Sequence, residues 1–259
     1  MKVIILAAGQ GTRLRPLTDN CPKCMVEVNG KSIIERQLDT MRACGIKEED
    51  ITIVAGYRND VLKEKFKDTK IRFIVNEDYE TTNMVCSFMC AKNLLESEYD
   101  VLVSYGDIIY GEEILKKIVD SAEDMSVIVD DGWFEYWSER CENPLDDAET
   151  LIFDENDYLM EIGQKTTDLN KVQSQYIGLM RFKGRGLEAV LNISAEAKRR
   201  SEAGESLWRT DRNYAKMYMT DLLQGLIDEN YKLKALHVHR GWFEIDDRDD
   251  LKLVEGQIK

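Results

Sequence analysis

Short apolar runs alternate with helical patterns through the first half of this chain, and this alternation limits the fold more than any other feature. Residues 3–6 form an uninterrupted apolar run, and residues 32–45 then carry apolar side chains at helical spacing before a closing glycine. The same order recurs, with strands expected at 51–57, 71–75, 101–107 and 125–129 and helices at 60–66, 81–96 and 112–122. Repeated units of this kind predict an α/β fold with a mostly parallel sheet and helices on both faces.

The pattern changes after residue 130. The second half predicts a hairpin at 150–163 around an acidic turn, strands at 175–182, 233–238 and 242–245, and helices at 187–204, 214–229 and 248–258. No repeat or linker separates the two halves, so we expect a single domain over residues 1–259. The second half should complete the same mixed sheet and add a small lid over the strand ends.

Composition excludes several classes of partner. A formal net charge of -14 argues against nucleic acid, because phosphate-tracking surfaces need clustered Lys and Arg. No apolar run approaches the ~20 residues of a membrane span, and the opening run stops after about seven residues, which predicts a buried strand and neither membrane insertion nor a signal peptide. The six cysteines follow no disulfide spacing, so we expect reduced thiols and a cytoplasmic location. The sequence leaves the oligomeric state open, a homodimer included.

A glycine loop follows the first strand, at the edge where open α/β sheets bind ligands. Gly9 and Gly11 allow backbone N–H groups to approach phosphates or a base closely. Leu14 occupies the third position of a dinucleotide fingerprint and no Gly-Lys-Ser/Thr follows, so neither of those motifs applies. A tight turn without function is the alternative, but Arg13 and Lys23 nearby supply the positive charge that a triphosphate site needs.

These residues resemble a known signature. The loop and its sequel resemble those of the nucleotidyltransferases that activate sugar 1-phosphates and small phospho-alcohols, through Leu6-Ala7-Ala8-Gly9-x-Gly11-Thr12-Arg13-Leu14-x-Pro16-Leu17-Thr18 and Pro22-Lys23-x-Met25. The resemblance spans the chain and implies a Rossmann-like fold with a nucleotide-binding half at 1–130 and an acceptor-binding half with the lid at 131–259. The implied nucleotide-binding residues are Leu6, Ala7, Ala8, Gly9, Gly11, Thr12, Arg13, Asn83 and Gly106.

Two carboxylates stand where that family places its metal ligands. Asp107 follows Gly106 at the end of a predicted strand, and Asp246 ends the late segment "WFEID". The resemblance implies Mg²⁺ as cofactor, held by these two side chains, and convergent carboxylates suit its preference for oxygen ligands. A solvated helix start is the alternative for the acidic run after Ile245. Whether Glu244 or Asp247 assists the metal is left open.

The implied reaction needs no nucleophile from the protein. An oxygen of the acceptor attacks the α-phosphorus of a nucleoside triphosphate in line and pyrophosphate leaves, so positioning and charge neutralisation carry the transfer. By the same resemblance, the catalytic residues are Arg13, which contacts the pyrophosphate and the α-phosphate, and Lys23, which contacts the acceptor phosphate.

A Cys-x-x-Cys pattern, Cys21 to Cys24, encloses that lysine. A thioredoxin-like pair should open a helix after a strand, whereas this pair is predicted in a loop. A zinc site needs further ligands, and the close pair Cys86 and Cys90 lies at helical spacing, typical of a core. We therefore interpret Lys23 as the functional residue of the segment and its cysteines as bystanders.

The acceptor is the least determined part of the prediction. Within the superfamily, chain length and the "GWFEIDD" ending resemble the bacterial phosphocholine, 2-aminoethylphosphonate and phosphoglutamine cytidylyltransferases, which implies CTP and a small amine-bearing phosphate or phosphonate. Trp133 and Trp137 follow Asp131 and offer π faces and a carboxylate to an ammonium group, with lid packing as the alternative. We add two further candidate acceptor contacts, Lys165 and Gln175.

Two other functions stay open at this point. A sugar-1-phosphate nucleotidyltransferase is the alternative enzyme, and a non-catalytic nucleotide-binding regulatory module on the same fold is the alternative of another class. The presence of Arg13, Lys23, Asp107 and Asp246 favours an enzyme. His237 and His239, the only histidines, are predicted to be structural residues of a late strand.

Overall fold

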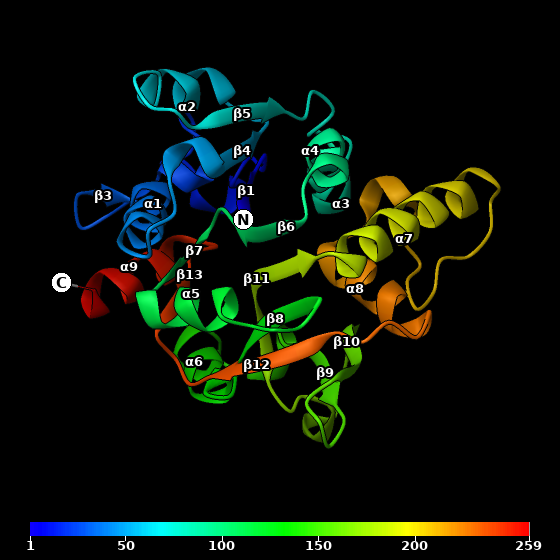
Figure 1. Cartoon of the computed structure of the whole chain (residues 1–259). Helices are drawn as coiled ribbons and strands as arrows, with labels where there is room; N and C mark the ends of the chain where they lie inside the picture. The colour runs from blue at the N-terminus through cyan, green and yellow to red at the C-terminus, as the bar shows by residue number, and fades with distance from the viewer. Residues whose placement is uncertain (259) are drawn as a thin grey trace.

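A seven-stranded sheet forms the centre of the molecule (Figure 1). The computed structural model describes residues 1–258. Six strands run parallel and β11 runs antiparallel to both of its neighbours, β6 and β8. The order across the sheet is β12 (Lys234–Val238), β8 (Met125–Asp130), β11 (Gln175–Lys183), β6 (Asp100–Tyr105), β1 (Lys2–Ala7), β4 (Ile51–Ala55) and β5 (Arg72–Val75). Strands from both predicted halves therefore share one sheet.

Helices cover both faces because successive strand residues point to opposite sides. In β1, Val3 and Ile5 belong to one buried cluster, and Ile4 and Leu6 belong to the other. The first cluster packs under α1 (Ile33–Ala43), α2 (Asn59–Lys65), α5 (Glu112–Val119) and α6 (Trp133–Arg140). The second packs under α3 (Met84–Met89), α4 (Lys92–Ser97), α7 (Arg185–Glu202) and α8 (Met219–Asp228).

The first helix shows how local sequence sets an element boundary. Ser32 and Glu35 form a capping box at the start of α1, which satisfies otherwise orphaned N–H groups and is worth about 1 kcal/mol. Gly45 follows the last turn with φ 80°, a conformation that glycine adopts without a steric penalty. The predicted helix at 32–45 therefore corresponds to a real element.

Two predicted helices are wrong in their extent. The segment 81–96 forms two short helices, and the cap is Asn83, whose side chain accepts a hydrogen bond from the N–H of Met84 at 2.8 Å. The segment 214–229 forms a 3₁₀ turn, Tyr214–Lys216, and then α8. Helix α6 was not predicted, because its four aromatic residues suggested a lid loop. The remaining 3₁₀ turns are Thr12–Leu14, Lys23–Met25, Glu48–Asp50, Pro144–Asp146 and Leu169–Lys171.

The second half adds the predicted hairpin, β9 (Glu149–Phe153) with β10 (Leu159–Lys165), which packs against α8. Two short ribbons complete the fold: β2 (Glu27–Val28) with β3 (Lys31–Ser32), and β7 (Ile108–Tyr110) with β13 (Trp242–Glu244). The final helix α9 (Arg248–Gln257) lies against α6 and against β2, although it is far from both in sequence (Figure 1). Pairing of β7 with β13 brings the segment after β6 next to the segment before α9.

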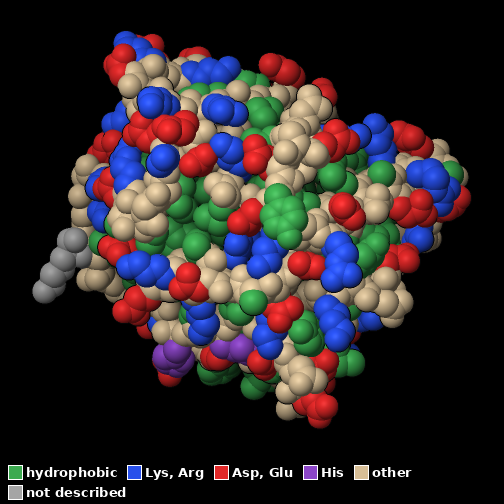
Figure 2. Space-filling view, in the orientation of Figure 1, with side chains coloured by type: hydrophobic (Ala, Val, Ile, Leu, Met, Phe, Trp, Pro, Cys, Tyr) green, Lys and Arg blue, Asp and Glu red, His purple; other side chains and the backbone are tan. Residues whose placement is uncertain are grey.

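The surface is mixed in charge. Figure 2 shows Lys and Arg side chains interspersed with Asp and Glu over the visible face, without an extended basic stripe on that face. Within residues 1–258, no helix combines the length and the apolar character that crossing a bilayer requires.

Candidate active site

The glycine loop connects β1 to a 3₁₀ turn at Thr12–Leu14. Gly11 has φ 62°, and a Cβ at that position would lie 2.9 Å from Cβ of Lys23. The hydroxyl of Thr18 also donates to the carbonyl of Gly11 at 2.8 Å. Glycine at this position therefore lets the segment that carries Lys23 pack directly against the loop.

A second close approach places the end of β6 beside the end of β1. A Cβ on Gly106 would lie 2.7 Å from the carbonyl oxygen of Leu6 and 3.0 Å from Cβ of Ala7. The N–H of Gly106 donates to the same Leu6 carbonyl at 2.9 Å. The residue after Gly106, Asp107, is thereby fixed at the mouth of the glycine loop.

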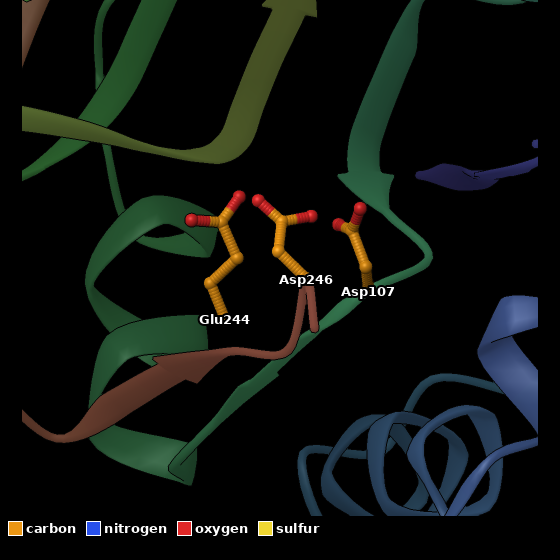
Figure 3. A group of neighbouring side chains, drawn as sticks. All are labelled: Asp107, Glu244 and Asp246. Atoms are coloured by element: carbon orange, nitrogen blue, oxygen red, sulfur yellow. The ribbon is translucent and has the colours of Figure 1, made fainter. Parts of the chain in front are cut away.

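Three carboxylates converge at this edge of the sheet, and we call them the carboxylate triad: Asp107, Glu244 and Asp246. One oxygen from each lies within 4.8 Å of the others. Figure 3 shows the three side chains pointing into the same space, Asp107 from the loop after β6, Glu244 from β13 and Asp246 from the turn that follows. The N–H of Ile245 donates to the carbonyl of Asp107 at 3.1 Å, which holds the two segments together.

Two cations predicted from the sequence contact this triad. The ammonium of Lys23 lies 2.8 Å from Asp107 Oδ2 and 2.5 Å from Asp246 Oδ1. Burial alone would lower the pKa of Lys23, but the charges of Asp107 and Asp246 raise it above its ordinary value. Arg13 Nη2 lies 2.9 Å from Asp246 Oδ2, and 63% of the Arg13 side chain is exposed. Lys23 is therefore a buried, permanently charged group, whereas Arg13 reaches out toward solvent.

A third cation was missed in the sequence. Arg140, on α6, is 5% exposed and its Nη1 donates to Glu244 at 2.9 Å. Its Nε and Nη2 donate to the two oxygens of Asp250, at 2.8 and 3.1 Å. Asp250 Oδ2 in turn accepts from the N–H of Asp246 at 2.9 Å. Arg140 thus fixes the segment that carries two members of the triad, and only the three-dimensional pairing of α6 with this segment reveals it.

Two members of the triad have pKa values shifted in opposite directions. Burial and the neighbouring charge of Asp246 raise the pKa of Glu244 to about 8. Burial would also raise the pKa of Asp246, but the ammonium of Lys23 outweighs it and lowers that pKa. Crowded carboxylates of this kind repel one another unless cations offset the repulsion.

The triad suits a divalent cation. Asp107 Oδ1 is buried and has no hydrogen-bond partner among residues 1–258, although a buried unsatisfied acceptor is unfavourable. Three carboxylates within ligand range provide the hard oxygen donors that Mg²⁺ prefers. Sequence analysis left open whether Glu244 assists the metal. Its spacing of two residues from Asp246 in an extended segment, which places both side chains on one face, was the sequence feature that indicated it.

The residues predicted to bind an ammonium do not form an open aromatic site. Trp133 and Trp137 are each 4% exposed and belong to the core cluster beneath α6. The cation over the Trp137 ring is Arg140, at 5.3 Å from the ring centre. Asp131 pairs with His237 at 2.9 Å. The packing alternative therefore describes both indoles, because their faces are already covered by neighbours.

The other predicted contacts have local partners. Asn83 caps α3, and its Nδ2 donates to the carbonyl of Lys216 at 3.4 Å. Lys165 Nζ donates to the carbonyl of Asp147 at 3.3 Å. Gln175 is buried and holds the backbone of Glu149. Their proposed contacts with nucleotide or acceptor stay predictions.

The Cys-x-x-Cys thiols are free, as are the other cysteines. Cys24 is buried within a 3₁₀ turn, and burial raises the pKa of its thiol to about 12. Reactive thiols have lowered pKa values, so this environment is opposite to that of a redox cysteine.

Comparison with known proteins agrees with this geometry. A family model described as nucleotidyl transferase matches residues 2–135. Over 258 residues, the chain is 39% identical to the CTP:phosphoglutamine cytidylyltransferase of Campylobacter jejuni, and the match covers 98% of each chain. The chain therefore belongs to the nucleotidyl transferase family, and the predicted enzyme class, nucleotidyltransferase, is confirmed.

A shorter similarity points to the same branch. Over 102 residues, 38% of this chain and 42% of the relative, the chain is 44% identical to the choline-phosphate cytidylyltransferase of Streptococcus pneumoniae. Among solved structures, a CTP:phosphocholine cytidylyltransferase from that organism gives a TM-score of 0.71 at 22% identity, over 100% and 99% of the two chains. An inositol-1-phosphate CTP transferase from T. maritima gives 0.73 at 19% identity, over 98% and 93%. The predicted α/β fold is confirmed.

Proposed function

We propose that the chain is a Mg²⁺-dependent cytidylyltransferase that transfers CMP from CTP to a small amine-bearing phosphate or phosphonate and releases pyrophosphate. The carboxylate triad, placed beside the glycine loop and interleaved with Lys23 and Arg13, carries this proposal. The 39% identical relative, matched from end to end, supports CTP as the nucleotide. Free thiols and the expected use of CTP favour the cytoplasm.

The triad residues Asp107, Glu244 and Asp246 are proposed to hold the metal. When bound, Mg²⁺ neutralises phosphate charge as a Lewis acid. The observation that supports its fit is the unpartnered Asp107 Oδ1 within the triad.

The other residues of the site bind and orient the reactants. Backbone N–H groups around Gly9 and Gly11 are proposed to contact the nucleotide, because these positions carry no side chain to obstruct it. Arg13 is exposed enough to reach the departing pyrophosphate. The raised pKa of Lys23 keeps its ammonium charged, so it acts as a cation for the acceptor phosphate and not as a base. The acceptor oxygen itself forms the new bond to the α-phosphorus as the bond to pyrophosphate breaks.

Release of pyrophosphate from CTP tests the proposal. Purified protein with Mg²⁺ should release pyrophosphate from CTP only in the presence of an acceptor, assayed against phosphoethanolamine, phosphocholine, 2-aminoethylphosphonate, phosphoglutamine and glucose 1-phosphate. Chelation of the metal should stop release. Turnover with glucose 1-phosphate alone would instead identify a sugar-1-phosphate enzyme, and nucleotide binding without turnover on any acceptor would identify a regulatory module.

A further inference from the structure

Glu149, at the start of β9, is held in place by its backbone and leaves its side chain without a protein partner. Its N–H donates to Gln175 Oε1 at 3.2 Å, and its carbonyl accepts from Gln175 Nε2 at 2.5 Å. Within residues 1–258, no hydrogen bond or ion pair engages the Glu149 carboxylate. The backbone is thus fixed while the carboxylate remains available.

The position of Glu149 relates it to the carboxylate triad. Gln175, whose side-chain amide holds the Glu149 backbone, opens β11 opposite Asp130, the last residue of β8. The next residue of β11, Tyr176, packs its ring edge-on against Tyr105, with the ring centres 5.7 Å apart. Tyr105 is two residues before Asp107, at the end of β6. Glu149 therefore lies at the same edge of the sheet as the carboxylate triad, the edge where β6 and β8 end.

The surroundings enclose the Glu149 carboxylate without neutralising it. Gly163, on β10, has φ 80°, and a Cβ there would lie 2.5 Å from Cβ of Thr220 and 3.5 Å from Glu149 Oε2. The positive φ and the close approach of Thr220 require glycine at this position, and the strand passes the carboxylate at ordinary contact distance. The residue is half-buried, so a small ligand can still reach it. Burial raises the pKa of Glu149 to about 7, with Lys165 opposing the shift.

We propose that Glu149 binds the amine of the acceptor and selects a primary ammonium over a trimethylammonium group. This inference rests on the proposed function only for the kind of acceptor, a small amine-bearing phosphate, and it names the residue that selects that acceptor. A carboxylate forms strong charge-assisted hydrogen bonds to N–H donors, which a primary ammonium has and a trimethylammonium lacks. A trimethylammonium group favours open aromatic faces, and the indoles of Trp133 and Trp137 are covered.

Phosphoethanolamine and phosphocholine provide a matched test because they differ only in the three methyl groups on nitrogen. With the wild-type protein, CTP and Mg²⁺, we expect a kcat/KM for phosphoethanolamine roughly ten- to a hundredfold above that for phosphocholine, the range expected for charged hydrogen bonds. Glu149→Gln should remove most of this preference by raising the KM for phosphoethanolamine, with the KM for CTP unchanged. Glu149→Asp keeps the charge and should restore part of it. Glu161→Gln, on the neighbouring strand, removes an ion pair with Arg209 and should leave the preference unchanged.

Calorimetric binding of the two acceptors, in the presence of a non-hydrolysable CTP analogue, separates this inference from the proposed function. If the wild type released no pyrophosphate with any acceptor but bound phosphoethanolamine more tightly through Glu149, the proposed function would fail and the inference would stand. Equal use and equal binding of both acceptors by the wild type would overturn the inference. So would a Glu149→Gln variant that lost both acceptors to the same extent.

Discussion

At the scale of single residues, the site holds buried charged groups that would each be destabilising without a partner. Asp107 has one oxygen paired with Lys23 and the other buried without a partner. An unsatisfied buried acceptor costs about 1–3 kcal/mol, so the folded protein carries a local destabilisation at this atom. Such a cost is expected where a residue is kept for ligand binding and not for packing.

Replacing Asp107 by Asn should abolish turnover while leaving the fold intact. The change removes a charge from the triad but preserves the volume of the side chain, so we expect kcat to fall by at least about a hundredfold. Pyrophosphate release and the melting temperature measure the two effects. Asp249→Asn is the control, because Asp249 is an exposed acid of α9 that pairs with Lys252. Retained activity with unchanged Mg²⁺ dependence in Asp107→Asn would show that this residue is not a metal ligand.

The raised pKa of Glu149 predicts how acceptor preference depends on pH. Below about pH 7 the carboxylate takes up a proton and loses its charge. The phosphoethanolamine-to-phosphocholine ratio of kcat/KM should therefore decline as pH falls from 8 to about 6, and it should be flat in Glu149→Gln. Taking a ratio cancels the titration of the triad and of the phosphates. The charged groups that act on Glu149 are Lys165, Asp221, Arg212 and Asp147.

The same shift also affects stability. The pKa of Glu149 in the folded protein lies above its ordinary value of 4.5. Protonated Glu149 therefore stabilises the fold below pH 4.5, and this stabilisation is lost as pH rises through about 7. Glu149→Gln should consequently melt at a higher temperature than the wild type at pH 8, and the difference should disappear near pH 4. A lower melting temperature for the variant at pH 8 would show that the carboxylate is paired in solution.

The two cysteines beside Lys23 provide a test of the loop. The double variant Cys21→Ser, Cys24→Ser should keep most of its turnover, because the Cys21 thiol donates to the carbonyl of Leu17 and Cys24 is a buried thiol. Replacing a buried thiol by a hydroxyl should lower the melting temperature slightly. Turnover of the wild type should also be insensitive to reductant. Activity that reductant switches on or off would identify the pair as a redox centre.

At the scale of elements, helix α6 does more than cover the sheet. Its last residue, Arg140, joins the helix to β13 through Glu244 and to α9 through Asp250. The guanidinium also lies over the rings of Tyr136 and Trp137, each 5.3 Å from the ring centre. The aromatic residues of α6 therefore support the cation that positions the triad, and they need not contact the acceptor to influence the reaction.

Arg181 offers a matched control for Arg140. Both are buried arginines with a two-point contact to an aspartate, Arg181 to Asp100 at 2.8 Å for each bond. Arg140→Met and Arg181→Met should each destabilise the fold by about 3–5 kcal/mol. The first leaves the buried carboxylate of Asp250 unpaired, and the second leaves the half-buried Asp100 and the carbonyls of the α5 C-terminus without their donor. Only Arg140→Met should also weaken Mg²⁺ binding and lower kcat in the fraction that remains folded. Equal effects of both variants on metal affinity would assign Arg140 a purely structural role.

Sequence patterns predicted most elements because burial on both faces demands long apolar runs, which are local features. They failed at residues 81–96, where helical spacing continues across Cys90 and Ala91 although the backbone breaks there. Asp107 was found because it ends a strand. Glu244, Arg140 and Glu149 were not assigned a role from the sequence. Glu244 and Arg140 contact each other from segments about a hundred residues apart. Glu149 differs from other acids because its carboxylate has no partner among residues 1–258, which only the structure reveals.

At the scale of the whole molecule, the site joins the beginning, the middle and the late part of the chain. Lys23 comes from the first segment, Asp107 from the centre of the sheet, and Asp246 from 139 residues further on. A third buried cluster secures this arrangement, with Leu14, Val28 and Ile33 packed against Leu251 and Val254 of α9. The glycine loop and the last helix therefore depend on a common core.

This dependence on late residues has a consequence during synthesis. The ribosome delivers the glycine loop, Lys23 and Asp107 early, and these parts of the sheet can begin to fold as they emerge. Glu244, Asp246 and the anchor Asp250 leave the exit tunnel much later, and Arg140 has no acidic partner until they do. In a nascent chain the carboxylate triad and its anchor are thus incomplete until residue 250 has emerged.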